Sequence, residues 1–444
     1  THPLSSAASD VYKRQGKDYV PGHQEIEIGL VKLYRVTGEI KYLELAKHLL
    51  DIRAEAKEGE YGQAHLPVVL QDEAVGHAVR ANYMYSAMAD VAALTGDSAY
   101  LAAIEKIWQN VAGKKLSVTG SVGARHQGEA YGENYHLPNH PYNETCAAIA
   151  NVYWNHRMFL LSGEAKYMDV LERALYNGVI SGLSLDGTKF FYPNTLEHDG
   201  ISTFNQGVNG RSPWFDCSCC PSNLSRFIPS VAAYAYASRD EKLYVNLYMN
   251  SELNVAVGQG ELQLVQETNY PWSGDIKIQF HNVKEVDAQL LLRIPGWVEE
   301  DAVPSDLFVF ENRASGAFTV RVNGKQLEPE IKEGYAMLTG SWNKGDMIEI
   351  SLPMEGRLLS ANEMVRAKTN LLAVQYGPLV YCAEEIDNQV DVLDYSLGRD
   401  VLIEAAYHSD LLGGVNMLRA DDLKLVPYYA WANRGPGKMK VWFK

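Results

Sequence analysis

The sequence predicts an α/α toroid followed by antiparallel β-sandwich domains. Two observations support this fold class: a helix-hairpin pattern recurs three times within residues 16–240, and the apolar period changes from helical to alternating after Arg239. The 444 residues are enough for about three domains. With 46% hydrophobic and 21% charged residues, the composition is typical of a folded globular protein.

Three glycines mark the helical hairpins. The stretches VTGEIKYLELA, LTGDSAYLAAI and LSGEAKYMDVL each place Thr or Ser before the glycine, an acid after it and Tyr four residues beyond it. We expect each glycine (Gly38, Gly96 or Gly163) to end one helix in a left-handed conformation and the acid to begin the next helix. Such helix pairs, arranged in a ring, form an α/α toroid.

A closed ring of six hairpins needs more helices than residues 16–240 supply. We therefore expect part of the ring to lie upstream, and residues 1–15, which lack an initiator Met and an apolar segment, to be a truncation edge or an expression remnant. The last helix of this part is expected at residues 223–238. Alternating runs such as KLYVNLYMN, DIKIQF and AFTVRVNG then predict a β-sandwich domain over residues 241–365 and a second β-rich region over residues 366–444.

Charge and hydropathy exclude two classes of partner. The net charge of −15 would repel a phosphate backbone, and no stripe of Lys and Arg occurs, so we expect no nucleic-acid partner. No apolar run reaches the roughly 18 to 20 residues that a membrane span needs. The 27 Tyr and 8 Trp could stack on sugar rings or simply pack in the core. The sequence indicates no oligomeric state, and it leaves both a bacterial cytoplasm and a periplasm open.

The stretch WFDCSCCPSN holds three of the five cysteines. Adjacent residues such as Cys219 and Cys220 form a disulfide only with strained geometry, because the usual Cα separation exceeds the ~3.8 Å between neighbours. A zinc ion takes thiolates and carboxylates, and Glu144 and Cys146 in NETCAAIAN would complete a set of three cysteines and one glutamate.

This set of residues has three interpretations: a structural zinc site, inert buried thiols, or a reactive centre. Cys217 could replace either of its neighbours as a ligand. Cys382 lies within an apolar run and is expected to pack in a core.

Several motifs together carry a resemblance to a known family. The stretches NETCAAIANVYWNHRMFLL, YNGVISGLSLDG, PWFDCSCCPSN, RIPGWV and QYGPLVYCAEE are similar to those of the zinc-dependent β-L-arabinofuranosidase family of glycoside hydrolases, from about Asp18 to the carboxyl end. The resemblance implies an (α/α)6 toroid followed by β-sandwich domains. It also implies retaining hydrolysis by a zinc-bound cysteine, with an arabinose-containing oligosaccharide or glycan as substrate.

The resemblance assigns a role to each residue of the set. It implies that Cys219 is the nucleophile, Glu129 the general acid/base and His77 a sugar-binding residue. The zinc ligands it implies are Glu144, Cys146, Cys219 and Cys220. Zinc would supply the ionised thiol, since a free cysteine is only a few per cent ionised at neutral pH whereas a metal-bound thiol is deprotonated.

Some assignments have competitors. Glu133 lies four residues from Glu129 and is a rival acid/base, and His77 could instead be a core histidine. We expect burial or nearby negative charge to raise the pKa of Glu129, so that it begins the reaction protonated. Tyr192 and Trp214 are candidates for stacking on a furanose ring, with packing an equal alternative.

The predicted function is an exo-acting retaining glycosidase that releases β-L-arabinofuranose from plant glycans or glycoprotein arabinosides. One alternative is a toroid-fold polysaccharide lyase or a two-carboxylate glycosidase in which the zinc is structural. Another is a carbohydrate-binding scaffold without catalytic activity.

Overall fold

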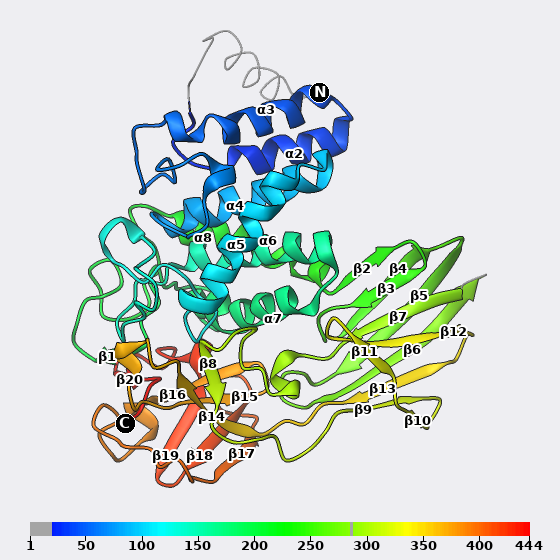
Figure 1. The fold of residues 1–444 in the computed structure, drawn as a ribbon. Helices are drawn as coiled ribbons and strands as arrows, with labels where there is room; N and C mark the ends of the chain where they lie inside the picture. Colours follow the sequence, from blue (N-terminus) through cyan, green and yellow to red (C-terminus); the bar gives the residue numbers. More distant parts are fainter. Residues whose placement is uncertain (1–19, 285–286) are drawn as a thin grey trace.

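The structure is a computed structural model that describes residues 20–284 and 287–444; the predicted edge at residues 1–15 lies outside them. It consists of a helical domain followed by β-sheet domains, which is the predicted order; residues 308–310 and 356–361, predicted within the sandwich at 241–365, lie in the carboxyl-terminal sheet (Figure 1). In Figure 1 the helices occupy the upper part, the middle sheets lie to one side and the carboxyl-terminal sheet lies below the helices. No helix in the described part of the chain is both long and apolar enough to span a membrane.

Three helical hairpins form most of the helical domain, and the packed pairs are α2 with α3, α4 with α5, and α6 with α7. Gly38, Gly96 and Gly163 end α2, α4 and α6 with φ of 71°, 72° and 79°, as the repeat predicts. Over the described residues the α-helices are α2 (Ile26–Thr37), α3 (Ile40–Asp51), α4 (Ala78–Thr95), α5 (Ser98–Lys114), α6 (Thr145–Ser162), α7 (Ala165–Arg173) and α8 (Cys219–Phe227).

The last helix differs from its prediction. It begins at Cys219 rather than Asn223, and its α-helical part ends at Phe227. A 3-10 turn follows over Ile228–Tyr234, because Pro229 lacks the N–H that would continue the α-helical hydrogen bonds. The earlier start puts Cys219 and Cys220 in the first turn of α8.

The middle domain is a sandwich of two sheets around its own apolar core. Its five-stranded sheet has the order β11-β12-β7-β3-β2, in which β3 and β7 run parallel, and its six-stranded sheet has the order β10-β9-β13-β6-β5-β4. The strands are β2 (Tyr236–Arg239), β3 (Lys242–Val245), β4 (Ser251–Val257), β5 (Gly260–Thr268), β6 (Asp275–Lys284), β7 (Asp287–Arg293), β9 (Thr319–Val322), β10 (Lys325–Leu327), β11 (Glu330–Lys332), β12 (Tyr335–Ser341) and β13 (Met347–Ser351).

The carboxyl-terminal sheet has the order β17-β18-β19-β16-β15-β14-β8, and β20 pairs with β16. It is joined to the helical domain by β1 (Glu197–Asp199), which pairs antiparallel with β20 (Lys438–Lys440). Cys382 is fully buried in this sheet, as expected of a core cysteine. The remaining strands are β8 (Phe308–Phe310), β14 (Gly356–Ala361), β15 (Ala373–Tyr376), β16 (Leu379–Glu384), β17 (Ile403–His408), β18 (Val415–Ala420) and β19 (Leu423–Pro427).

Buried ion pairs connect the middle sandwich to α7. The Arg293 guanidinium on β7 lies 2.6 Å from Asp169 Oδ1 and 2.5 Å from Glu172 Oε1, and its Nε donates to the Asn246 carbonyl. The Tyr270 hydroxyl donates to the same Glu172 oxygen. Arg293, Asp169 and Glu172 are called the arginine cluster below.

Candidate active site

Two helix N-termini supply the central side chains of the site. Glu144 is the N-cap residue of α6 and Cys146 lies in its first turn, while Cys219 and Cys220 occupy the first turn of α8. The two helices pack against each other. The unpaired N–H groups at a helix N-terminus favour negative charge, so both ends suit ionised thiols and carboxylates.

Glu144, Cys146 and Cys220 form a buried cluster, called the metal cluster below. Their ligand atoms all lie within 4.8 Å of one another. Cys220 Sγ donates to Glu144 Oε1 over 3.4 Å, and Glu144 Oε2 has no hydrogen-bond partner in the protein. Three groups that ionise to anions, with a carboxylate oxygen left over, can hold a metal ion.

The pKa values of the three groups in the metal cluster are shifted by burial and by one another. Burial raises the pKa of Glu144 and of Cys220 well above their ordinary values, and the Cys146 thiol beside each raises them further. The pKa of Cys146 is lowered, chiefly by its hydrogen bond with Cys220. The charge of Arg226 also lowers the pKa of Cys146, but among the described residues no Lys or Arg is hydrogen-bonded to any of the three groups.

Cys219 lies beside this cluster and at the protein surface. Its Sγ is 3.2 Å from Cys217 Sγ, and both residues are exposed. Burial of the thiol and the Cys217 thiol raise the pKa of Cys219 to about 11, while a hydrogen bond with Tyr192 acts in the opposite direction. The Cys219 sulfur is not among the three grouped ligand atoms, so in this conformation it faces Cys217 rather than Glu144.

Glu129 and His77 adjoin the metal cluster. His77 Nε2 lies 3.0 Å from Glu129 Oε2, the Tyr142 hydroxyl donates to Glu129 Oε1 over 2.9 Å, and the His77, Glu129 and Glu144 ligand atoms lie within 4.8 Å of one another. The loop carrying Glu129 is fixed by an antiparallel bridge between His77 and Ala130. Glu129 itself adopts a positive φ of 51°, which is uncommon for a residue other than glycine.

The expectation of a raised pKa for Glu129 is wrong. Its hydrogen bond with His77 is the largest effect and lowers the pKa; burial opposes this, while hydrogen bonds with Glu144 and Tyr142 lower the pKa further. The hydrogen bond between Glu129 and Glu144 lowers the pKa of Glu129 and raises the pKa of Glu144. The pKa values of the two carboxyls are therefore shifted in opposite directions, that of Glu129 downward and that of Glu144 upward.

Tyr192 and Trp214, the two predicted stacking residues, differ in burial. Tyr192 is buried between Tyr142 and Phe215, with ring centroids at 6.3 Å and 5.5 Å. Trp214 is 59% exposed, and its ring approaches Phe190 at 6.4 Å.

Glu133 is separate from the site. It forms an exposed ion pair with Arg125. Of the two rival glutamates, only Glu129 contacts the metal cluster and His77.

Three residues at the site were not predicted from the sequence. Tyr142 binds Glu129, the Gln206 amide donates to the Tyr142 hydroxyl over 3.1 Å, and Asn223 lowers the pKa of Cys146 by a hydrogen bond. The position of Tyr142, two residues before Glu144, was the only signal in the sequence.

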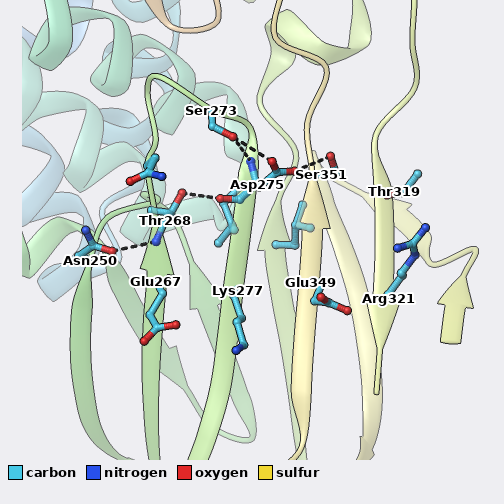
Figure 2. Close-up of a pocket in the computed structure, with 13 residues that line it drawn as sticks. Asn250, Glu267, Thr268, Ser273, Asp275, Lys277, Thr319, Arg321, Glu349 and Ser351 are labelled. Carbon is cyan, nitrogen blue, oxygen red and sulfur yellow. Dashed lines mark hydrogen bonds between the residues drawn. The ribbon is translucent and has the colours of Figure 1, made fainter. Parts of the chain in front are cut away.

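A separate hollow of about 750 Å³ lies on the outer face of the six-stranded sheet (Figure 2). Glu267, Lys277, Glu349 and Arg321 line it on four neighbouring strands and lie opposite one another in register. Alternating charges across strands stabilise an exposed sheet face. The described lining contains no Cys or His, so this hollow is distinct from the site.

Comparisons with known proteins identify the family of this chain. Residues 6–233 match the catalytic domain of the GH127 β-L-arabinofuranosidase family, residues 242–354 its middle domain and residues 356–444 its carboxyl-terminal domain. A non-reducing end β-L-arabinofuranosidase from Bifidobacterium longum subsp. longum is 35% identical, and the alignment covers 95% of this chain and 70% of the relative.

Two solved structures are also similar. A GH127 β-arabinofuranosidase is 48% identical with a TM-score of 0.94, over 99% of this chain and 72% of the other. A GH127 β-L-arabinofuranosidase from Geobacillus stearothermophilus T6 is 38% identical with a TM-score of 0.89, over 99% and 75%. With three consecutive family domains and a site of matching chemistry, this chain belongs to the β-L-arabinofuranosidase family of glycoside hydrolases, GH127.

Proposed function

We propose that this chain is an exo-acting retaining hydrolase that releases β-L-arabinofuranose from plant glycans or glycoprotein arabinosides. Cys219 is the nucleophile, Glu129 is the general acid/base, and His77, Tyr192 and Trp214 bind the sugar. The observation that supports this most is the contact between two groups of residues. The buried metal cluster and the His77–Glu129 pair share Glu144, so a carboxyl suited to proton transfer lies beside two adjacent cysteines.

Zinc is the proposed metal, with Glu144, Cys146, Cys219 and Cys220 as its ligands. The fit rests on the donor set, since thiolates together with one carboxylate are typical of zinc. When bound, zinc keeps the thiols ionised and supplies the positive charge that the metal cluster lacks. Cys219 would turn from Cys217 toward Glu144 to join the set, a rotation that its exposed position permits.

The first chemical step forms a bond from the Cys219 sulfur to the anomeric carbon of the arabinofuranose. As that bond forms, the bond to the leaving oxygen breaks and Glu129 gives its proton to this oxygen. Glu129 must be protonated when the substrate binds. His77 and Tyr142 hydrogen-bond to the Glu129 carboxyl and orient it.

The second step reverses these roles. Glu129, now ionised, takes a proton from water as the water oxygen attacks the anomeric carbon, and the carbon–sulfur bond breaks to restore Cys219. The lowered pKa of Glu129 suits this step, because the carboxylate is the base. Two inversions at one carbon leave the product with the configuration of the substrate.

The test compares two neighbouring cysteines. Cys219→Ser and Cys217→Ser remove thiols that lie 3.2 Å apart on two exposed residues, so any general effect of losing a thiol at this surface is shared. The readouts are zinc content by metal analysis and hydrolysis of p-nitrophenyl β-L-arabinofuranoside. We expect Cys219→Ser to lower kcat/KM at least about a thousandfold and Cys217→Ser to retain most activity.

The stereochemistry of the released sugar gives a second readout. Proton NMR during the first minutes should show β-L-arabinofuranose before mutarotation. Full activity of Cys219→Ser would refute the nucleophile. A product with an ultraviolet-absorbing double bond would indicate a lyase instead.

A further inference from the structure

We propose that a small buried cavity between the helical domain and the carboxyl-terminal sheet binds a single chloride ion. The cavity has a volume of about 10 Å³, enough for one water molecule or one ion of similar size. Its polar wall comes from Ser117 and Asn143 of the helical domain and from Lys368 and Trp442 of the carboxyl-terminal region. The cavity therefore lies where segments that are distant in the sequence meet.

Lys368 brings a positive charge to this cavity without a carboxylate partner. The residue is 3% exposed, and among the described residues its ammonium donates only to Asn139 Oδ1. Its Nζ also lies 5.3 Å from the centroid of the Trp442 ring. Burial lowers the pKa of Lys368 to about 7, and the charge of Glu197 offsets only part of this effect. A buried charge without a partner is costly, so an anion in the cavity would keep the lysine ionised.

Two further donors at the cavity have no partner within the described part of the chain. They are Asn143 Nδ2 and Trp442 Nε1, and each of these residues is 1% exposed. Buried N–H groups in folded proteins are almost always bonded to the protein, to water or to an ion. Both residues line the cavity that Lys368 lines, so one occupant can accept from all three.

The chemistry of the wall selects a small anion. None of the described lining residues is an acid, a histidine or a cysteine, so a metal cation would find no ionised ligand. Phosphate and carboxylate groups have several heavy atoms and exceed about 10 Å³. A water molecule fits, but it carries no charge to pair with Lys368 and needs acceptors for its own hydrogens. A chloride ion only accepts, and its charge pairs with the ammonium.

The cavity adjoins the loop that leads into the candidate active site. Asn143 lies between Tyr142, whose hydroxyl donates to Glu129, and Glu144 of the metal cluster. Lys368 contacts the same loop through Asn139. An ion bonded to both Asn143 and Lys368 would hold this loop against the carboxyl-terminal region. We therefore expect bound chloride to stabilise the folded chain, and this binding can be measured without any assay of hydrolysis.

The direct experiment locates the ion by its anomalous scattering. Crystals of the full chain grown in sodium chloride, with diffraction measured at long wavelength, should show an anomalous peak in the cavity. The peak should lie within hydrogen-bonding distance of Lys368 Nζ, Asn143 Nδ2 and Trp442 Nε1. Density of a water molecule without an anomalous peak would overturn the proposal.

The second experiment measures the melting temperature of the full chain as sodium gluconate is replaced by sodium chloride at constant ionic strength. Raising chloride from about 1 mM to about 100 mM should raise the melting temperature by about 1–3 °C. Lys368→Met removes the cation, keeps most of the side-chain volume and should abolish this rise. Trp442→Phe removes one donor and should require about fivefold more chloride for the same rise.

Lys440→Met is the matched control. Lys440 is also a buried lysine whose ammonium donates to an uncharged oxygen, the Leu393 carbonyl, but it does not line the cavity. This variant should keep the full dependence on chloride. A rise of equal size in the unaltered chain and in Lys368→Met would indicate a general effect of salt and would overturn the site. Loss of the rise in Lys440→Met as well would show that the dependence does not belong to this cavity.

Discussion

The chain buries two clusters of ionisable side chains. One pairs its carboxylates with an arginine, and the other contains only groups that ionise to anions. In the arginine cluster, burial raises the pKa of Asp169 to about 6, but the Arg293 guanidinium opposes this and pairs with Glu172 as well. In the metal cluster, Glu144, Cys146 and Cys220 all ionise to anions, and within the described residues no Lys or Arg bonds to any of them.

The difference separates a structural role from a functional one. A buried charge must be paired, so the arginine cluster is complete within the chain and holds β7 to α7. The metal cluster needs positive charge from outside the polypeptide. Its neighbour Glu129 lies within 4.8 Å of the Glu144 carboxyl. Substitutions in the two clusters should therefore change different properties: stability in the first, and activity with metal binding in the second.

The largest effect is expected for Glu129→Gln, which removes proton transfer and keeps the shape of the side chain. We expect kcat/KM on an alkyl arabinofuranoside to fall by roughly 10²- to 10⁴-fold, with the melting temperature almost unchanged. A nitrophenyl leaving group should largely restore the first step, since it departs without a proton. Glu133→Gln is the matched control, because Glu133 pairs with Arg125 at the surface. An equal loss in both variants would show that Glu129 is not the acid/base.

The fold could be predicted from the sequence because its signals are local. The Gly38, Gly96 and Gly163 repeat depends on a left-handed φ that glycine adopts without strain, and the structure has it at all three positions. The start of α8 was missed by four residues. The serine and cysteines before Pro221 show no apolar spacing typical of a helix, so the start of α8 could not be predicted from periodicity. Pro221 is tolerated only because it lies in the first turn.

The site could be predicted only in part. The ligand preferences of zinc predicted that Glu144, Cys146 and Cys220 lie together, although more than seventy residues separate the two segments. The structure places the three in one cluster. The predicted direction of the pKa shift of Glu129 was wrong, because the shift depends on His77 and Tyr142. These residues contact the carboxyl only in the folded chain. Gln206 was missed for the same reason.

The second effect tests the arginine cluster. Arg293→Met leaves Asp169 and Glu172 buried without a cation, so we expect a loss of about 3–5 kcal/mol in the free energy of unfolding. Urea denaturation measures this, and zinc content per folded chain should not change. The control is Arg399→Met, since the Arg399–Glu311 pair is more exposed and should contribute about 0–1 kcal/mol. Loss of zinc from the Arg293 variant would mean that the two clusters are coupled.

The third effect is expected on metal removal. A ligand that binds only the folded state adds about 2.7 kcal/mol at a hundred times its Kd, so dialysis against a chelator should lower stability by about this amount or more. Added zinc should restore both stability and arabinofuranoside hydrolysis. Combined with Arg293→Met, the two losses should add, because the clusters share no residue. A chelated chain with unchanged stability and activity would contradict the metal cluster.

The smallest effect concerns Tyr142, whose hydroxyl donates to the proposed acid/base Glu129. Its hydroxyl donates to the ionised form of Glu129 and so lowers the pKa of that carboxyl. Tyr142→Phe removes about 1 kcal/mol of hydrogen bonding, which is roughly a fivefold loss in kcat/KM. The pKa of Glu129 should rise, so the protonated acid persists to higher pH and the alkaline limb of the kcat/KM profile moves upward. Tyr100→Phe removes a similar hydrogen bond, to Asp51, and should leave the profile in place. A downward shift in the Tyr142 variant would mean that the hydroxyl stabilises the protonated carboxyl, and that the lowered pKa of Glu129 depends on His77 without help from Tyr142.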